Sequence, residues 1–209
     1  RTILPRILPG WSYALLLFRR GKKIPEEYKE IRYNLCSIDF DPSAGTFGSR
    51  IDTLVNAEAL GKSVSFPRPS YDGKYIMFTL SDYGNFSIWH KEADLWLLDL
   101  TSGDLRKLSE VNSDDTESFH NWSSNSRWFV FSSRRGDGLY TRLYLASMDE
   151  NGKISKPFLL PQEDPETYYD RSVYSYNVPD FTSEPIKIDT RVFEKKITSK
   201  ERIQVQAKK

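Results

Sequence analysis

The sequence predicts an all-β fold of repeated four-stranded antiparallel units, the arrangement of a β-propeller. Apolar runs of strand length recur about every fifty residues, and turns rich in glycine, asparagine and aspartate stand at matching places between them. No long stretch spaces its apolar residues as a helix does. A period of about fifty residues with four strands is the size of one propeller blade.

The second strand of each unit is an almost wholly apolar run. Phe18, Phe78 and Phe131 stand at matching places in these runs and lie 60 and 53 positions apart. A strand is apolar on both faces when neighbouring sheets cover both of them, so these strands are expected to lie between blades. The runs are residues 14–20, 75–81 and 128–134.

Turns and shorter strands complete each unit. Asp72-Gly73 precedes the second run, and Asn125 stands at the matching place before the third run. Glycine, and asparagine less well, tolerate the positive φ of a tight turn. Third strands are expected at 34–41, 94–100 and 142–148, and closing strands at 50–55, 105–108 and 157–160. Helix is expected only in short pieces, at 26–30, 56–60 and 194–200.

Burial between blades follows from these strands. Six large side chains are predicted to lie in the core because sheets cover both of their faces. They are Phe78, Trp96, Leu98, Leu108, Phe131 and Tyr144.

Composition excludes several classes of protein. The 209 residues carry 30 Lys plus Arg against 29 Asp plus Glu, a net charge of +1, without the basic excess that nucleic-acid binding requires. Hydrophobic residues make up 38% of the chain, too many for a disordered segment, and no apolar run is long enough to cross a membrane. Cys36 is the single cysteine, and His90 and His120 are the two histidines, so internal disulfides, Cys-rich zinc sites and multi-histidine metal centres are excluded.

The clearest unit begins with Pro69-Ser70-Tyr71-Asp72-Gly73-Lys74 and an apolar strand, followed by Ala93-Asp94-Leu95-Trp96-Leu97-Leu98 and a Gly103 turn that closes on Leu108. This pattern resembles the repeat of TolB-like propellers. The match is close over 66–108, good over 120–160 and looser over 15–55. Residues 63–89, 112–135 and 161–181 are similar to TolB-like proteins of Bacteroidetes-type cell envelopes. The resemblance implies a periplasmic or envelope-anchored protein that binds protein or peptide partners.

The resemblance also sets expectations for the extent of the ring. Blades are expected at approximately 11–60, 61–110 and 116–162, with 173–186 starting or closing a further blade, all within a propeller region of 1–188. Residues 189–209 form a charged tail that is expected to be solvated. Because rings close with about four to eight blades, we expect the chain to be the C-terminal part of a six- to eight-bladed ring. Upstream residues or another chain would supply the other blades, and Pro5 makes 2–8 a poor innermost strand.

The densest group of candidate site residues precedes and follows the third apolar run. Carboxylates suit a hard cation such as Ca²⁺, but without the spacing of a calcium loop a solvated loop that caps its own backbone is favoured. His120 is expected to be a packed, hydrogen-bonded histidine. The paired arginines either bind an anion or pair with the acidic loop, and the second interpretation is favoured. The six candidates are Asp114, Asp115, Glu117, His120, Arg134 and Arg135.

No catalytic set and no cofactor motif is recognisable in the sequence. The favoured function is therefore a non-catalytic interaction module. One alternative is the propeller part of a two-domain hydrolase of the prolyl oligopeptidase type, although this chain has no Gly-x-Ser-x-Gly turn. Another is a glycan-binding propeller, in which exposed Trp and Tyr side chains stack on sugars. Fold alone does not choose between these classes.

Overall fold

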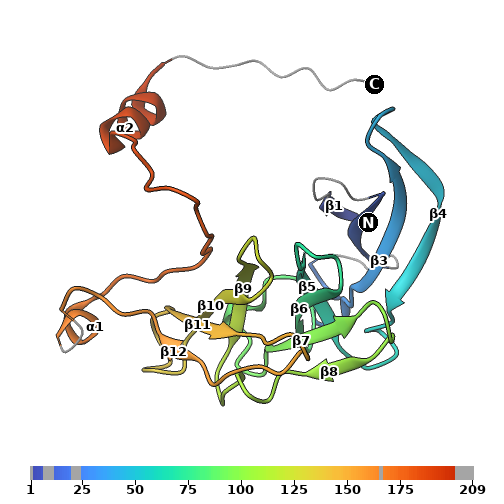
Figure 1. The fold of residues 1–209 in the computed structure, drawn as a ribbon, viewed down its shortest axis with the longest axis horizontal. Coiled ribbons are helices and arrows are strands. Elements are labelled where there is room, and N and C mark those ends of the chain that lie inside the picture. The colour runs from blue at the N-terminus through green and yellow to red at the C-terminus, as the bar shows by residue number, and fades with distance from the viewer. Residues whose placement is uncertain (1, 7–11, 20–24, 165–166, 201–209) are drawn as a thin grey trace.

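The structure is a computed structural model that describes residues 2–6, 12–19, 25–164 and 167–200. Within these residues the strands form three antiparallel sheets of four strands each, and each sheet uses consecutive strands of the chain (Figure 1). The first sheet consists of β1 (Thr2–Arg6), β2 (Tyr13–Phe18), β3 (Asn34–Asp41) and β4 (Thr46–Val55). The second consists of β5 (Ser63–Pro69), β6 (Tyr75–Ser81), β7 (Asp94–Asp99) and β8 (Leu105–Lys107). The third consists of β9 (Glu117–Trp122), β10 (Trp128–Ser133), β11 (Arg142–Ser147) and β12 (Phe158–Leu159).

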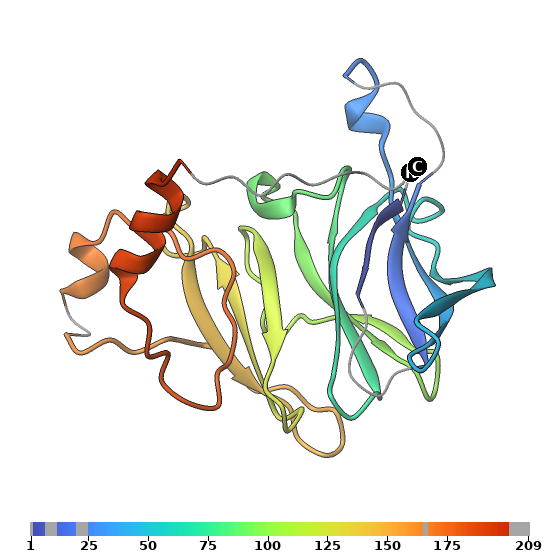
Figure 2. The same ribbon diagram turned by 90° about the horizontal axis from the view of Figure 1, so that it is seen from above.

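The three sheets are β-propeller blades. They stand side by side in chain order, and the innermost strands β5 and β9 of the second and third blades contact each other (Figure 2). This arrangement confirms the all-β fold class and the four-stranded unit expected from the repeat. The described helices are short. Two lie in loops between the second and third strands of a blade, η1 (Tyr28–Glu30) and η2 (Ser87–Trp89), and two follow the third blade, α1 (Tyr168–Arg171) and α2 (Thr190–Thr198).

The first blade has an innermost strand, which corrects the expectation that it lacks a clear one. β1 pairs with β2 through Thr2 with Phe18 and Ile3 with Leu17. The register shifts between Ile3 and Arg6, and Pro5 lies within that shift. Proline is tolerated at such an irregularity because no ladder hydrogen bond needs its missing N–H.

Register also corrects the alignment of the first unit with the others. Phe78 pairs with Trp96 and Phe131 pairs with Tyr144, as the repeat predicts. In the first blade the equivalent of Phe78 is Leu16, and Phe18 lies two residues further on, where its side chain is 38% exposed. An apolar run does not reveal its register, because every position in it looks alike until pairing is known.

Two apolar layers hold the blades together, one at each junction. Alternate residues of β6 serve both layers: Phe78 packs against the first blade and Met77 against the third, because successive side chains of a strand point to opposite faces. Of the six predicted core residues, Trp96 and Tyr144 are only partly buried and pack against the two apolar layers. Phe78, Leu98, Leu108 and Phe131 are buried.

The innermost strands β5 and β9 share one distortion. Phe66 and Phe119 have φ of +52° and +40°, in the region that glycine favours, and the pairing with the second strand shifts at both places. The two rings pack with their centroids 4.4 Å apart. Two neighbouring blades therefore repeat the same bulge, which turns one aromatic side chain of each strand toward the other.

After the third blade the described chain contains α1 and continues without regular secondary structure to α2 (Figure 1). Asp189 caps α2 by accepting a hydrogen bond from the Arg191 amide. The predicted helix at 194–200 thus begins earlier, at Thr190. No helix in the described part of the chain combines the length and apolarity that crossing a membrane requires.

Candidate functional site

Three loops meet at one end of the second and third blades. Residues 82–93 join β6 to β7, residues 108–116 join β8 to β9, and residues 134–141 join β10 to β11. Because the strands alternate in direction, these loops share one end, and the short turns at 70–74 and 123–127 share the other. The loop carrying η2 lies on the upper edge in Figure 2.

This loop end holds a cavity of about 500 Å³ that four of the predicted site residues line. Lys91 of the second blade faces it from one side, and Asp137 of the third blade from the other. The walls therefore mix cationic and anionic side chains. The four predicted residues in the lining are Asp114, Asp115, Arg134 and Arg135.

Glu117 lies beneath the cavity and is fully buried. Its Oε1 accepts hydrogen bonds from Ser113 Oγ at 2.6 Å, from Ser133 Oγ at 2.8 Å and from the Arg135 guanidinium at 2.9 Å. Burial raises the pKa of this carboxyl, and the hydrogen bonds from Ser113 and Ser133 and the charge of Arg135 oppose that rise. Glu117 is thus a buried residue that holds the loop at 108–116 in place.

Arg135 is the partner of this carboxylate and is held on its other side by aromatic rings. Its guanidinium carbon lies 4.5 Å from the ring centroid of Tyr144 and 5.4 Å from that of Phe131. The sequence left two interpretations of the arginine pair, anion binding or an ion pair with the acidic loop. Arg135 forms the ion pair, with Glu117.

Arg134 reaches the opposite side of the loop end and lies over Trp89. Its guanidinium carbon is 5.3 Å from the Trp89 ring, a cation–π arrangement, and the guanidinium donates to the carbonyls of Ile88 and Gly138. Trp89 is 72% exposed, and Phe86 in the same loop is 58% exposed. Arg134 therefore fixes an exposed tryptophan at the rim of the cavity.

Sequence reasoning missed Phe86 and Trp89. The signal was available, since residues 85–90 combine a phenylalanine, an isoleucine and a tryptophan with the polar residues Asn85, Ser87 and His90. Large apolar side chains in a connecting loop mark either a packed loop or a contact surface. Ile88 is packed at 5% exposure, whereas its two aromatic neighbours are not.

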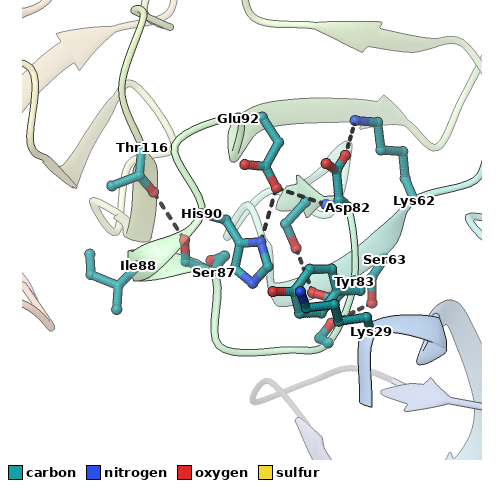
Figure 3. Close-up of polar contacts among 12 residues, drawn as sticks. Lys29, Lys62, Ser63, Asp82, Tyr83, Ser87, Ile88, His90, Glu92 and Thr116 are labelled. Atoms are coloured by element: carbon teal, nitrogen blue, oxygen red, sulfur yellow. Dashed lines mark hydrogen bonds and ion pairs between the residues drawn. The ribbon is translucent and has the colours of Figure 1, made fainter. Parts of the chain in front are cut away.

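Polar contacts hold this loop in place (Figure 3). Lys62 forms a 2.6 Å ion pair with Asp82, whose amide donates to Glu92 Oε1 at 3.2 Å. The same oxygen lies 2.9 Å from His90 Nδ1, and the His90 ring packs edge-on against Tyr83. Both ends of the loop are thereby tied together on the outer side of η2.

On the inner side, buried hydroxyl groups tie η2 to both innermost strands. Ser87 Oγ lies 3.2 Å from Ser65 Oγ of β5 and 2.9 Å from Ser118 Oγ of β9. Thr116 Oγ1 donates to the Ser87 carbonyl at 3.1 Å (Figure 3). All four side chains are fully buried, so these hydrogen bonds form away from competing water and fix the position of Trp89 relative to the blades.

The remaining predicted residues do not form a metal centre. His120 is buried in the blade junction, with Nε2 2.9 Å from the Met77 carbonyl, as a packed histidine should be, and it does not line the cavity. Asp115 accepts the Thr116 amide at 2.8 Å, the local capping expected of a polar loop. Among the residues that the structure describes, no group of three or more His, Cys, Asp or Glu is placed to hold a metal ion.

Comparisons with protein-family models and with curated proteins give no match. Several solved structures do resemble the chain. TolB from Acinetobacter baumannii is 18% identical over 79% of this chain, with a TM-score of 0.49. The β-propeller domain of the Trilobed protease from Pyrococcus furiosus is 15% identical over 78%, with a TM-score of 0.44. A puromycin hydrolase is 18% identical over 78%, with a TM-score of 0.49.

The chain spans only part of each of these proteins: 33% of TolB, 43% of the protease propeller and 23% of the hydrolase. At these identities, and with TM-scores below 0.5, the similarity assigns no function to the chain.

Proposed function

We propose that the chain is a non-catalytic interaction module of the cell envelope that binds a protein or peptide partner through its loop end. The single observation that carries this proposal is Trp89, a largely exposed tryptophan held under the Arg134 guanidinium on a loop that buried hydrogen bonds keep rigid. Exposed Trp and Arg side chains dominate the binding energy of many interfaces. A pre-ordered loop also loses little conformational entropy when a partner binds.

The cavity beside Trp89 supports the same proposal. Lys91 and Arg134 offer positive charge, and Asp114 and Asp115 offer negative charge, within one lining. A polypeptide presents both signs along its side chains and termini, so a mixed lining suits it better than a simple anion or cation. Rim charges of this kind mainly select the partner and its orientation.

Site-specific photocrosslinking tests the proposal in the producing cell. A photoreactive phenylalanine analogue at position 89 is expected to give an ultraviolet-dependent adduct with one discrete polypeptide, identified by mass spectrometry. The same analogue at position 71 is the control, because Tyr71 is 51% exposed but lies in the turn at the opposite end of the blades.

The purified partner then provides the quantitative test. Trp89→Ala is expected to weaken its binding about 10-fold to 100-fold, the range of a hot-spot residue, whereas Tyr71→Ala leaves the dissociation constant unchanged. Equal crosslinking at positions 71 and 89, or unchanged affinity of the Trp89 variant, contradicts the proposal. Fractionation that finds the native protein only in the cytoplasm contradicts its envelope location.

A further inference from the structure

The segment after α1 repeats a contact that joins each blade to the next. The amide of Val64 donates to the Tyr33 carbonyl at 2.9 Å, and the amide of Glu117 donates to the Ala93 carbonyl at 2.8 Å. These two bonds start the innermost strands of the second and third blades. The amide of Tyr176 donates to the Thr141 carbonyl at 3.1 Å, and register makes Thr141 the equivalent of Ala93.

A second contact repeats further along the same segment. In β9, Asn121 Oδ1 accepts the amide of Trp122 at 3.1 Å, and in the segment Asp180 Oδ1 accepts the amide of Phe181 at 2.8 Å. Counting from Glu117 and Tyr176, these pairs stand at the same positions. Residues 176–181 therefore align with 117–122, the innermost strand of the third blade, although Val178, at the place of Phe119, does not share its positive φ.

The third blade anchors this segment through three polar side chains. The Ser132 hydroxyl lies 2.9 Å from the carbonyl oxygens of both Tyr176 and Asn177, and Thr141 Oγ1 donates to Asn177 Oδ1 at 2.8 Å. Arg142, only 5% exposed, donates to the Tyr174 carbonyl at 2.7 Å. The segment is thus fixed against the face of the third blade that points away from the second.

That face keeps the apolar side chains that an adjoining blade would cover. Val130, Leu143 and Leu145 are the register equivalents of Met77, Leu95 and Leu97, on which Phe129 and Phe131 of the third blade pack. Val130 is already buried at 5% exposure, so the uncovered positions are Leu143 and Leu145. These two are only partly buried, whereas Leu95 and Leu97 are 0% and 2% exposed. In the described part of the chain, residues 176–181 belong to none of the three sheets.

We propose that residues 176–181 are the innermost strand of a fourth blade, and that their free edge docks an antiparallel β-strand from a separate polypeptide. The pairs that β9 makes with β10 predict the contacts: the incoming strand pairs at Tyr176 and Asn177 and again at Asp180 and Phe181. Large apolar side chains at alternate positions, like Phe129 and Phe131, cover Leu143 and Leu145. This is strand addition, in which backbone hydrogen bonds give affinity and alternate side chains give specificity.

Amide hydrogen exchange on the full chain tests the proposal. The probe is a synthetic peptide with the sequence of residues 126–133, the second strand of the third blade, extended by a solubilising lysine tag. Its addition is expected to slow exchange in residues 177–181. A control peptide in which serine replaces both phenylalanines lacks the covering side chains and is expected to leave exchange unchanged.

Substitutions on the face of the third blade that points away from the second provide the matched variants. Leu145→Lys is expected to weaken peptide binding at least 10-fold, and Leu139→Lys, on the neighbouring loop where the side chain is 69% exposed, is expected to leave it unchanged. Slowed exchange at 177–181 that Leu145→Lys abolishes supports the proposal. Absence of binding at about 1 mM peptide, slowed exchange at the free edge of β12 instead, or self-association of the chain through this face overturns it.

Discussion

Phe131 shows how a single residue of the repeat supports the fold. Its side chain is fully buried at the junction of the second and third blades, where it contacts Phe129 and Tyr144 and lies under the Arg135 guanidinium. The Phe131 ring therefore packs in the apolar layer between the blades and also contacts Arg135, which holds the loop end. The sequence indicated the first role from the apolar run, and the second depends on contacts that no local pattern contains.

Phe131→Ala is expected to lower the free energy of unfolding by about 3–5 kcal/mol, because it removes a buried ring and leaves a cavity. Chemical denaturation followed by intrinsic fluorescence measures the loss. Phe158→Ala is the matched control, since Phe158 lies in the same sheet but is 45% exposed, and its effect should stay within about 0.5 kcal/mol. A loss below about 1 kcal/mol at Phe131 contradicts its place in the core.

Glu117 gives a pH-dependent prediction. Its pKa in the folded chain is raised above the ordinary value of 4.5, so the folded state binds the proton more tightly than the unfolded state does. The unfolding free energy of the native chain is therefore expected to fall as pH rises from below 4.5 through the raised folded-state pKa. In Glu117→Gln this contribution is absent, so the stability of the native chain relative to the variant declines over that window.

Denaturation midpoints at a series of pH values measure this difference. Glu150→Gln is the control, because the Glu150 side chain is 78% exposed and its replacement should leave the profile unchanged. A relative stability of the native chain that increases with pH would show that the Arg135 charge outweighs burial at this site.

At the scale of elements, the glycine turns confirm the chemistry that the sequence indicated, whereas in the turn before β10 the positive φ, +57°, lies at Ser126 and not at Asn125. Gly73 and Gly103 have φ of +73° and +80°, and Asp99 Oδ1 accepts the amide of Thr101 at 2.7 Å in the second of these turns. Short turns were predictable because their geometry depends on adjacent residues alone. The loop at 82–93 was not, because the bonds that fix it come from β5, β9 and the residue before β9.

Gly103→Ala tests the turn without any steric contact. No atom lies within 4 Å of the position that a Cβ would occupy, so the expected loss of about 1–2 kcal/mol comes from positive φ alone. Gly136→Ala is the control, since Gly136 also has open space but lacks a positive φ, and its effect should be within about 0.5 kcal/mol. Thermal unfolding measures both, and equal effects would show that the φ of Gly103 carries no strain.

At the scale of the whole molecule, the two end blades each expose large apolar side chains. Phe18 and Ile51 of the first blade are 38% and 47% exposed, and Trp128 and Phe158 of the third are 41% and 45% exposed. Inner blades bury such residues against their neighbours, so the open faces are expected where a neighbouring blade is absent.

The native chain is accordingly expected to bind a hydrophobic dye such as anilinonaphthalene sulfonate while folded. Phe158→Lys should reduce the dye fluorescence, whereas Tyr71→Lys, which changes an exposed turn residue, should not. Titration of the dye at a temperature below unfolding provides the measurement. A cooperatively folding monomer that binds no dye contradicts the open faces.

The sequence by itself determined the repeat, the four-strand unit, the turns and most of the blade cores. Each of these depends on the alternation of apolar residues or on neighbours within a few positions, so a local pattern contains it. It also singled out the acidic loop and the arginine pair and favoured an ion pair between them, but it did not show that Glu117 and Arg135 form that pair or that Glu117 is buried.

Only the tertiary structure decided the register of the first blade, the pairing of β1, and the exposure of Trp89 beside Arg134. It also separated His120 and Glu117, which lie below the surface, from the four candidates that line the cavity. These features depend on residues far apart in the sequence that meet across a blade junction, as Thr116 meets Ser87, 29 positions away, and Arg134 meets Ile88, 46 positions away. Which side chains meet there depends on strand register and loop path, which a single sequence does not encode locally.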